Sequence, residues 1–427
     1  MSKRSFVDEE SLIKIKKICN GEKEISQDHE TFINILDDDS CGKIFSYLSI
    51  RERLSIEQVC SRWQEIAMHK SWNNITKLDF SDAKIIDNYF DGKIPTQSEL
   101  EILLSRCGRY LRKLNLSSDY DDQILKAVNN YCPNLTSLKL NLTEHVQRKY
   151  DENCFINAFT KMTDLKQFFI HSAYGHGILE SLDSLPANIL EIHLSMKSYS
   201  SKNSTYHSHF QQALSKFKNL HKLSINKINL ENKTIEIIGQ MKSLIHLDLA
   251  EIYAGIFSSF MPLTNFPDLE YLNLRSIQNG TEDDDILKEL FINSKKLKYL
   301  DISLNFGVTE LGLTHVAKMK NLEVLKINSL LTGEVNFVQF YKLKIFECEG
   351  WAGACDATLQ TVLENSPDLK IIDARNTNLT VKSLVLANDI TKGRMNNIVL
   401  HFKVDLALIL NFHKLGMISP FLILEAM

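Results

Sequence analysis

Histidine side chains are the first candidates for chemistry in this chain. His207 and His209 are separated by one residue, and His171, His176 and His193 precede them in the sequence. No acidic or cysteine ligand accompanies them at the spacing of a metal site. We therefore interpret them as surface histidines and expect no metal.

Cysteine is the second candidate. The eight cysteines are scattered, with no CxxC pair, which is typical of a protein in a reducing compartment. Cys19, Cys41 and Cys60 have no adjacent histidine and acid to activate a thiol. The sequence also lacks a GxGxxG helix start, a Walker loop, HExxH and GxSxG. We expect no catalysis and no cofactor.

Composition narrows the class of partner. The chain has 427 residues, is 44% hydrophobic and carries a formal net charge of -4. A chain without a basic field is not expected to bind nucleic acid. The N-terminus has no apolar run of signal-peptide length, and VDLALILNF near the C-terminus is too short to span a membrane. We expect a soluble protein of the cytoplasm, the nucleus or both, without a membrane partner.

One short pattern recurs along most of the chain: apolar, two variable residues, apolar, one variable residue, apolar. Thirteen segments fit it, mostly 24 to 31 residues apart. They begin at Ile75, Leu111, Leu135, Leu165, Ile189, Leu220, Leu244, Leu269, Leu297, Leu322, Leu343, Leu369 and Met395. One such segment carries no information, but a regular series indicates a repeat array.

Each repeat is expected to contribute a short strand with inward apolar residues and a returning helix, and stacked neighbours bury the core. Tyr131-Cys132-Pro133-Asn134-Leu135 resembles the cysteine-containing subclass of leucine-rich repeats. The resemblance implies an α/β fold, a curved solenoid with parallel concave strands and convex helices. We assign residues 73–402 to about 13 repeats and 403–427 to a C-terminal cap. The segments 87–100 and 196–209 are predicted to be surface insertions.

The stretch from Ile35 to Ala67 precedes the array and has the spacing of three short helices. Residues 37–40 are acidic or cap-forming, and Ser49 with Glu52 forms a capping-box pattern. Further on, Val59, Cys60, Trp63, Ile66 and Ala67 fall on one helical face. More apolar residues are present than one docking face needs, so we favour a partner-binding segment over a simple end cap of the solenoid.

This stretch resembles an F-box, on Ile35-Leu36, Ile44-Phe45, Tyr47-Leu48, Arg53-Leu54, Val59-Cys60 and Arg62-Trp63. One position differs, because Asp37 replaces the customary proline. We assign 31–72 to the F-box and 1–30 to a flexible tail. The resemblance to F-box proteins of the leucine-rich class implies that the chain docks on a Skp-family adaptor of a cullin-RING ubiquitin ligase and holds a protein substrate on its repeats. It implies that the following residues contact the adaptor or form the small core: Leu36, Ile44, Phe45, Leu48, Leu54, Val59, Cys60 and Trp63.

Two functions follow from the resemblance, and neither needs a catalytic residue. The chain is the substrate-recognition subunit of an SCF-type ligase, or it is a scaffold that binds a partner without promoting its ubiquitination. Strand alternation predicts which residues face the substrate: Asp248, Tyr271, Arg275, Tyr299, Asp301, Lys326, Glu347, Glu349, Asp373 and Arg375. Their charges suggest a basic, partly aromatic substrate segment, and a merely solvated face is the alternative.

Overall fold

The computed structural model describes residues 35–81, 94–116, 120–142, 154–172, 176–196, 205–254, 259–277, 283–417 and 419–426. The expected tail, residues 1–30, lies outside these ranges. The chain divides into two compact units, Met1–Lys166 with Ser184–Pro186, and Gln167–Asp183 with Ala187–Met427. The division falls inside the repeat array, so the expected boundary between F-box and solenoid does not separate the two units.

The first unit begins with the three short helices that the sequence predicts. These are α2 (Asp38–Phe45), α3 (Ile50–Ile56) and α4 (Ser61–Lys70). They are followed by β1 (Lys77–Asp79), α6 (Gln97–Cys107), η2 (Gly108–Tyr110), β2 (Lys113–Leu116), α7 (Ile124–Tyr131) and β3 (Ser137–Leu142). Strands β1, β2 and β3 pair in parallel, in that order.

The second unit alternates strands with helices. In order it contains β4 (Gln167–Ser172), α8 (His176–Ser181), β5 (Glu191–Met196), α9 (Thr205–Lys216), β6 (Lys222–Asn226), β7 (Asn229–Leu230), α10 (Asn232–Gly239), β8 (His246–Asp248), β9 (Tyr253–Ala254) and η5 (Met261–Thr264). The series continues with β10 (Tyr271–Asn273), α11 (Asp283–Asn293), β11 (Tyr299–Asp301), α12 (Glu310–Val316), β12 (Val324–Lys326), β13 (Ile345–Glu347), α13 (Asp356–Asn365), β14 (Ile371–Asp373), α14 (Val381–Gly393), β15 (Leu400–Lys403), α15 (Leu406–His413) and β16 (Leu422–Glu425). The short turn η4 (Leu182–Ser184) lies at the division.

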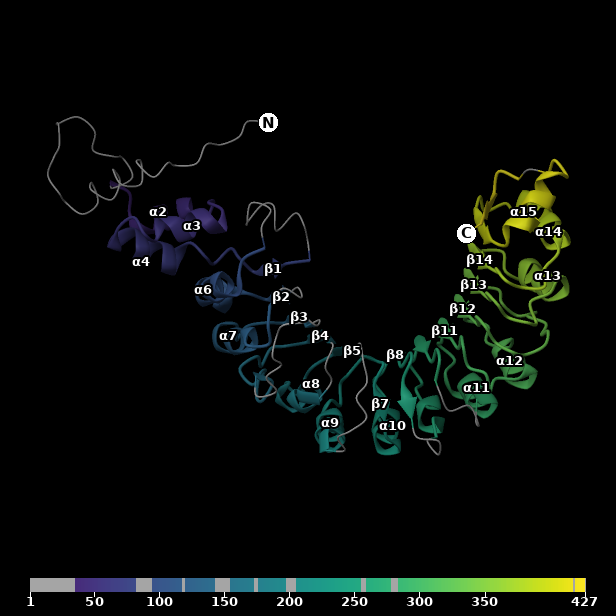
Figure 1. Ribbon diagram of the computed structural model, residues 1–427, viewed down its shortest axis with the longest axis horizontal. Helices are drawn as coiled ribbons and strands as arrows, with labels where there is room; N and C mark the ends of the chain where they lie inside the picture. Colours follow the sequence, from purple (N-terminus) through teal and green to yellow (C-terminus); the bar gives the residue numbers. More distant parts are fainter. Residues whose placement is uncertain are drawn as a thin grey trace. The chain divides into compact units, whose positions relative to one another are not determined.

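Within the second unit, the paired strands run parallel and lie on the inner, concave side of a curved array, and the helices lie on the outer side (Figure 1). The pattern residues explain this arrangement. In the repeat that starts at Leu269, the side chains of Leu269, Leu272 and Leu274 are all buried between sheet and helices. The same three positions are buried in every predicted segment except the one at Met395. The repeating strand–helix units expected of a leucine-rich-repeat array are therefore confirmed.

The exception is a register error at the C-terminal end. Phe402, not Ile398, pairs with Ile372 of the preceding strand, and Met395 is 98% exposed. The motif can be placed on the segment from Ile398 to Val404 in more than one register, because its apolar residues fit the pattern at several starting positions. Strand β16 then pairs in parallel with β15, so residues 403–427 add a helix and a strand to the array. Their role as a cap remains a prediction.

A left-handed residue follows most strands of the second unit. It stands two positions after the last apolar residue of the motif, as at Ser276, Leu304 and Gly350. Of these, Gly350 adopts φ +66° without steric cost, whereas a residue with a Cβ does not. The chain therefore turns from strand to helix through the same backbone conformation in successive repeats, also at Lys227, Glu251, Ser329 and Asn376.

The two predicted insertions are partly helical. Thr96 caps α6, since its hydroxyl accepts from the Glu99 backbone and the Glu99 carboxylate accepts from the Thr96 backbone. Likewise α9 begins at Thr205, inside the second segment predicted to be a surface insertion. A capping-box pattern at Thr96 and Glu99 was the signal for the first of these helices. No helix within the described ranges is both long and apolar enough to cross a membrane.

Candidate functional site

Two of the three N-terminal helices, α2 and α3, begin at side-chain caps that the sequence encodes. The carboxylate of Asp37 accepts a hydrogen bond from the Ser40 backbone at 2.7 Å, which starts α2 and lowers the pKa of Asp37. Ser49 and Glu52 form the expected reciprocal capping box at α3. Asp37 thus gives the helix a side-chain cap that a proline at this position has no group to provide.

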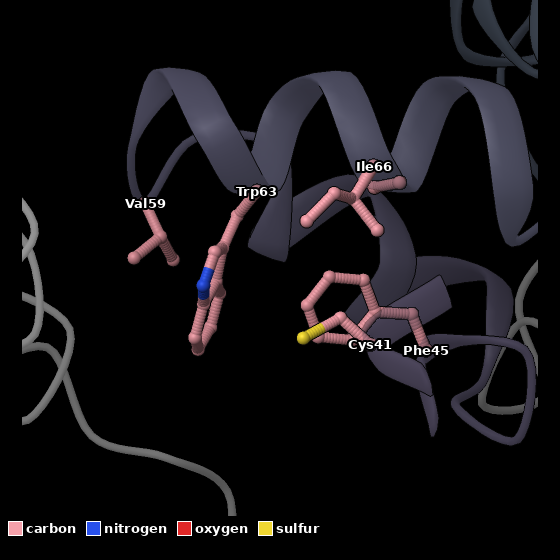
Figure 2. Packing of buried hydrophobic residues seen from close by; sticks show 6 residues of the cluster. Cys41, Phe45, Val59, Trp63 and Ile66 are labelled. Carbon is pink, nitrogen blue, oxygen red and sulfur yellow. The ribbon is translucent and has the colours of Figure 1, made fainter. Parts of the chain in front are cut away.

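A small hydrophobic core joins these helices (Figure 2). It contains Cys41, Phe45, Val59, Trp63, Ile66 and Ala67. The rings of Phe45 and Trp63 lie 5.2 Å apart, between α2 and α4. Because this core is complete within the first unit, the helices need no partner to bury it.

The structure separates the eight expected adaptor residues into three groups. Phe45, Val59 and Trp63 are buried in the core. The side chains of Leu36, Leu48, Leu54 and Cys60 are half-buried, whereas Ile44 is 43% exposed. Only the exposed and half-buried residues are accessible to another protein.

Two exposed apolar residues accompany Ile44. Tyr47 is 78% exposed and Ile35 is 69% exposed, and the Tyr47 backbone donates to the Ile44 carbonyl one turn earlier. Ile35 and Tyr47 both belong to the F-box-like pattern. Helical periodicity alone did not predict that their side chains are exposed rather than part of the core. We call Ile35, Ile44 and Tyr47 the exposed F-box residues.

Arg53 is a buried residue of the F-box-like pattern to which the sequence assigned no role. Its guanidinium donates to the carbonyls of Ser46, Leu48 and Ser71 and to the side chain of Asn74. It also lies over the ring of Trp72, 5.4 Å from the ring centre. Arginine is rarely buried this fully, so composition gave no reason to expect this role.

The three helices are attached to the first repeat helix. The Arg106 guanidinium of α6 lies 2.9 Å from the Glu57 carboxylate, whose side chain is 6% exposed. Nearby, the Tyr110 hydroxyl is 3.5 Å from the His69 carbonyl. These contacts hold the F-box-like helices against the repeat that follows them in the first unit.

The concave face of the second unit carries three outward residues on each strand. Tyr271, Asn273 and Arg275 occupy these positions in the repeat that starts at Leu269. The first outward position forms what we call the apolar stripe: His246, Tyr271, Tyr299, Val324, Ile345 and Ile371, all half-buried. The second forms the polar column: Asp248, Asn273, Asp301, Lys326, Glu347 and Asp373.

Stacked rings build the first half of the apolar stripe. The His246 and Tyr271 rings stack at 3.8 Å and the Tyr271 and Tyr299 rings at 4.0 Å. Burial lowers the pKa of His246 to about 4 and raises the pKa of both tyrosines, so these rings are neutral at physiological pH. The sequence prediction included the tyrosines and missed the rest of the stripe, although strand alternation contains the signal.

The polar column is less open than predicted. Asp301 is only 4% exposed and Asp373 only 6%, because neighbouring strands crowd the second outward position. Lys326 pairs with Glu347 at 2.9 Å. Further along, Arg375 pairs with Asp373 at 2.6 Å and with Glu349 at 3.0 Å. Arg275 remains exposed. Several predicted substrate-facing charges therefore bind one another.

The described part of the chain shows no group of histidine, cysteine or acidic side chains that would hold a metal. His193 instead stacks on Phe169 and lies 2.9 Å from Glu191, and His209 is exposed. The side chains of residues 176 and 207 lie outside the described set. Burial raises the pKa of the Cys132 thiol to about 12 and also raises that of Cys107, so both thiols stay protonated at neutral pH.

Comparison with known proteins agrees with this geometry. Residues 38–77 match the family model described as F-box-like. No curated protein matches the sequence. A chain of the yeast Rad7 and Elc1 complex is 17% identical, with 88% of this chain and 90% of that chain covered and a TM-score of 0.51. An internalin from Listeria monocytogenes is 16% identical, with 83% and 96% covered and a TM-score of 0.46.

These findings define the class. The chain joins an F-box-like domain to an open, parallel leucine-rich-repeat solenoid. The yeast structure shares this fold.

Proposed function

We propose that this chain is the substrate-recognition subunit of an SCF-type cullin-RING ubiquitin ligase. Its F-box binds a Skp-family adaptor, and its repeats hold a protein substrate for ubiquitination by partner subunits. The supporting observation is that the F-box-like core is complete while Ile35, Ile44 and Tyr47 remain exposed. Large apolar side chains contribute about 1.5–3 kcal/mol each when a partner buries them, before ordering costs.

In this proposal the chain contributes proximity and orientation, and other subunits carry the chemistry. The exposed F-box residues, with half-buried Leu36, Leu48, Leu54 and Cys60, form the adaptor surface. Phe45, Val59 and Trp63 support that surface from the core. The substrate lies on the concave face of the second unit, and the complex works in the cytoplasm, the nucleus or both.

Co-purification with a Skp-family adaptor tests the first half of the proposal. We expect Ile44→Ser with Tyr47→Ser to lose the adaptor and to keep the wild-type unfolding transition, because neither side chain belongs to the core. A matched control replaces Leu311 and Leu331, which are also exposed, by serine. Adaptor binding by the folded F-box double variant would refute the docking surface. Phe45→Ala and Trp63→Ala are unsuitable, since they remove core side chains.

The alternative is a scaffold that binds a partner without promoting its ubiquitination. A ligase subunit co-purifies with a cullin as well as the adaptor, and its bound protein accumulates when the F-box is deleted. A scaffold shows neither result.

A further inference from the structure

The apolar stripe is continuous over six neighbouring strands of the second unit. The registers place His246, Tyr271, Tyr299, Val324, Ile345 and Ile371 side by side from β8 to β14. All six side chains are half-buried, so each keeps apolar area exposed on the concave side. With strands about 4.8 Å apart, the stripe is about 24 Å long.

One edge of the stripe carries mostly paired charges. Lys298 pairs with Glu270 at 2.8 Å, and Lys344 pairs with Glu323 at 2.5 Å. These pairs join neighbouring strands just before the first outward position. With exposed Lys370, which precedes Ile371, they leave one net positive charge along this edge.

The other edge is the polar column, and it is acidic. Lys326 and Arg375 are already paired with Glu347 and with Asp373. The Asp248 carboxylate instead accepts hydrogen bonds from the Asn226 side chain and the Ala250 backbone. The Asp301 carboxylate accepts a hydrogen bond from the Ser303 backbone.

Asp248 is half-buried, so a bound cation can approach its carboxylate directly, whereas Asp301 is 4% exposed, already lies near Lys326 and Arg275, and acts on a bound cation through space. Burial raises the pKa of both groups. The free-energy cost of desolvating the ionised carboxylates therefore exceeds the stabilisation that their hydrogen-bond donors and nearby charges provide. A cationic side chain placed beside Asp248 supplies favourable charge to both carboxylates. The tyrosine ring faces are stacked on each other, so the carboxylates, rather than ring faces, are the groups for a cation to reach.

We propose that the apolar stripe and polar column together bind an extended segment of the substrate in which apolar side chains alternate with lysine or arginine. In an extended chain, successive side chains point to opposite sides. A segment lying across the strands, above the boundary between stripe and column, directs one set onto the stripe and the other toward Asp248 and Asp301. At about 3.3 Å per residue, the stripe accommodates roughly seven residues.

This inference rests on the proposed function, because it identifies the class of substrate that the repeats hold. It is tested with the full chain and labelled synthetic peptides by fluorescence anisotropy. The probe peptide is Val-Lys-Val-Lys-Val-Lys-Val. One comparison peptide has glutamate for lysine, and another has the same composition with its lysines grouped at one end. We expect the alternating basic peptide to bind at least about tenfold more tightly than either.

Two variants locate the binding site. Asp248→Asn with Asp301→Asn removes the charges and preserves the shape, and Val324→Thr with Ile345→Thr reduces the apolar area. Each is expected to weaken the basic peptide by about tenfold while its unfolding transition is unchanged. The matched control is Leu311→Ser with Leu331→Ser, outside stripe and column, which keeps full affinity.

The outcomes separate this inference from the docking proposal. Equal binding of all three peptides, no binding of any, or unchanged affinity in both concave variants overturns the inference. Those concave variants are expected to keep the adaptor. Conversely, Ile44→Ser with Tyr47→Ser keeps the peptide and loses the adaptor, so failure of one proposal leaves the other measurable.

Discussion

Replacing Arg53 by methionine should unfold the F-box-like helices far more readily, although Arg53 is not a docking residue. Methionine keeps much of the apolar stem and removes every hydrogen-bond donor. The Ser71 carbonyl then loses its guanidinium donor, and Ser71 is fully buried. The Leu48 carbonyl also loses a donor, but Leu48 is half-buried and water can replace it.

The magnitude follows from these partners. A buried acceptor without a donor costs about 1–3 kcal/mol, and a hydrogen bond from a charged group contributes about 1.5–3 kcal/mol. The Ser46 carbonyl keeps a donor, since the Asn74 side chain reaches it at 2.8 Å. The contact of Arg53 with the Trp72 ring adds roughly 0.5–1 kcal/mol. We therefore expect a loss of about 2 to 4 kcal/mol in the free energy of unfolding of this part of the chain.

Urea unfolding followed by tryptophan fluorescence measures this loss. The chain has three tryptophans, and Trp63 and Trp72 both lie in or beside the F-box-like helices. A Trp351→Phe background, applied to every variant, makes them the only reporters. The matched control is Arg51→Met, which changes an exposed arginine of the same helix and should cost less than about 0.5 kcal/mol. Equal stability of the Arg53 and Arg51 variants would refute the role assigned to Arg53.

Two further predictions concern the repeats. Gly350→Ala should lower the melting temperature through a cost of about 1 kcal/mol in the free energy of unfolding, because φ is +66° and the new Cβ would lie 3.2 Å from the Ser329 hydroxyl. Ser276→Gly, at the equivalent position with φ 54°, should be neutral or stabilising. A calorimetric scan in which Gly350→Ala melts at the wild-type temperature would contradict the steric argument. Although burial acts to raise it, hydrogen bonds from Ser383 and Thr380 lower the pKa of Asp356 below its usual 3.8. The ionised form is therefore favoured by folding, its stabilisation is present above that pH, and it is lost as pH falls through the lowered pKa. Asp356→Asn should remove this acid-dependent part of the unfolding curve, and an identical pH profile in wild type and variant speaks against it.

The repeat array was predictable because its signal is both local and periodic. Each apolar triplet specifies a strand, and stacking specifies that successive strands pair in parallel. The error at Met395 arose where neighbouring frames were equally apolar. The start of α6 was missed because the segment before Gln97 is rich in turn-forming residues, and its capping box was a weaker local signal.

The sequence predicted which residues belong to the F-box site, but it did not predict which of their side chains are exposed. Phe45 and Ile44 are adjacent in sequence and similarly apolar, but Phe45 faces Trp63 and Ile44 is exposed. Which face of a helix is covered depends on where α4 lies against α2, and that is a tertiary property. The role of Arg53 was missed for the same reason, since three of its acceptors are backbone carbonyls that any sequence possesses.

The concave charges show how tertiary pairing changes the meaning of a sequence pattern. Counted along the chain, the substrate-facing set mixes acids with bases, and from it the sequence suggested a basic, partly aromatic substrate segment. Once Lys326 binds Glu347 and Arg375 binds Asp373, Asp248 is the half-buried carboxylate that neither of these cations pairs with, and Asp301 lies buried further along the same column. These two carboxylates, rather than the total charge, determine which substrate is favoured. The same reasoning disfavours a phosphorylated segment, because a phosphate near two desolvated carboxylates adds like charge where a cation is needed.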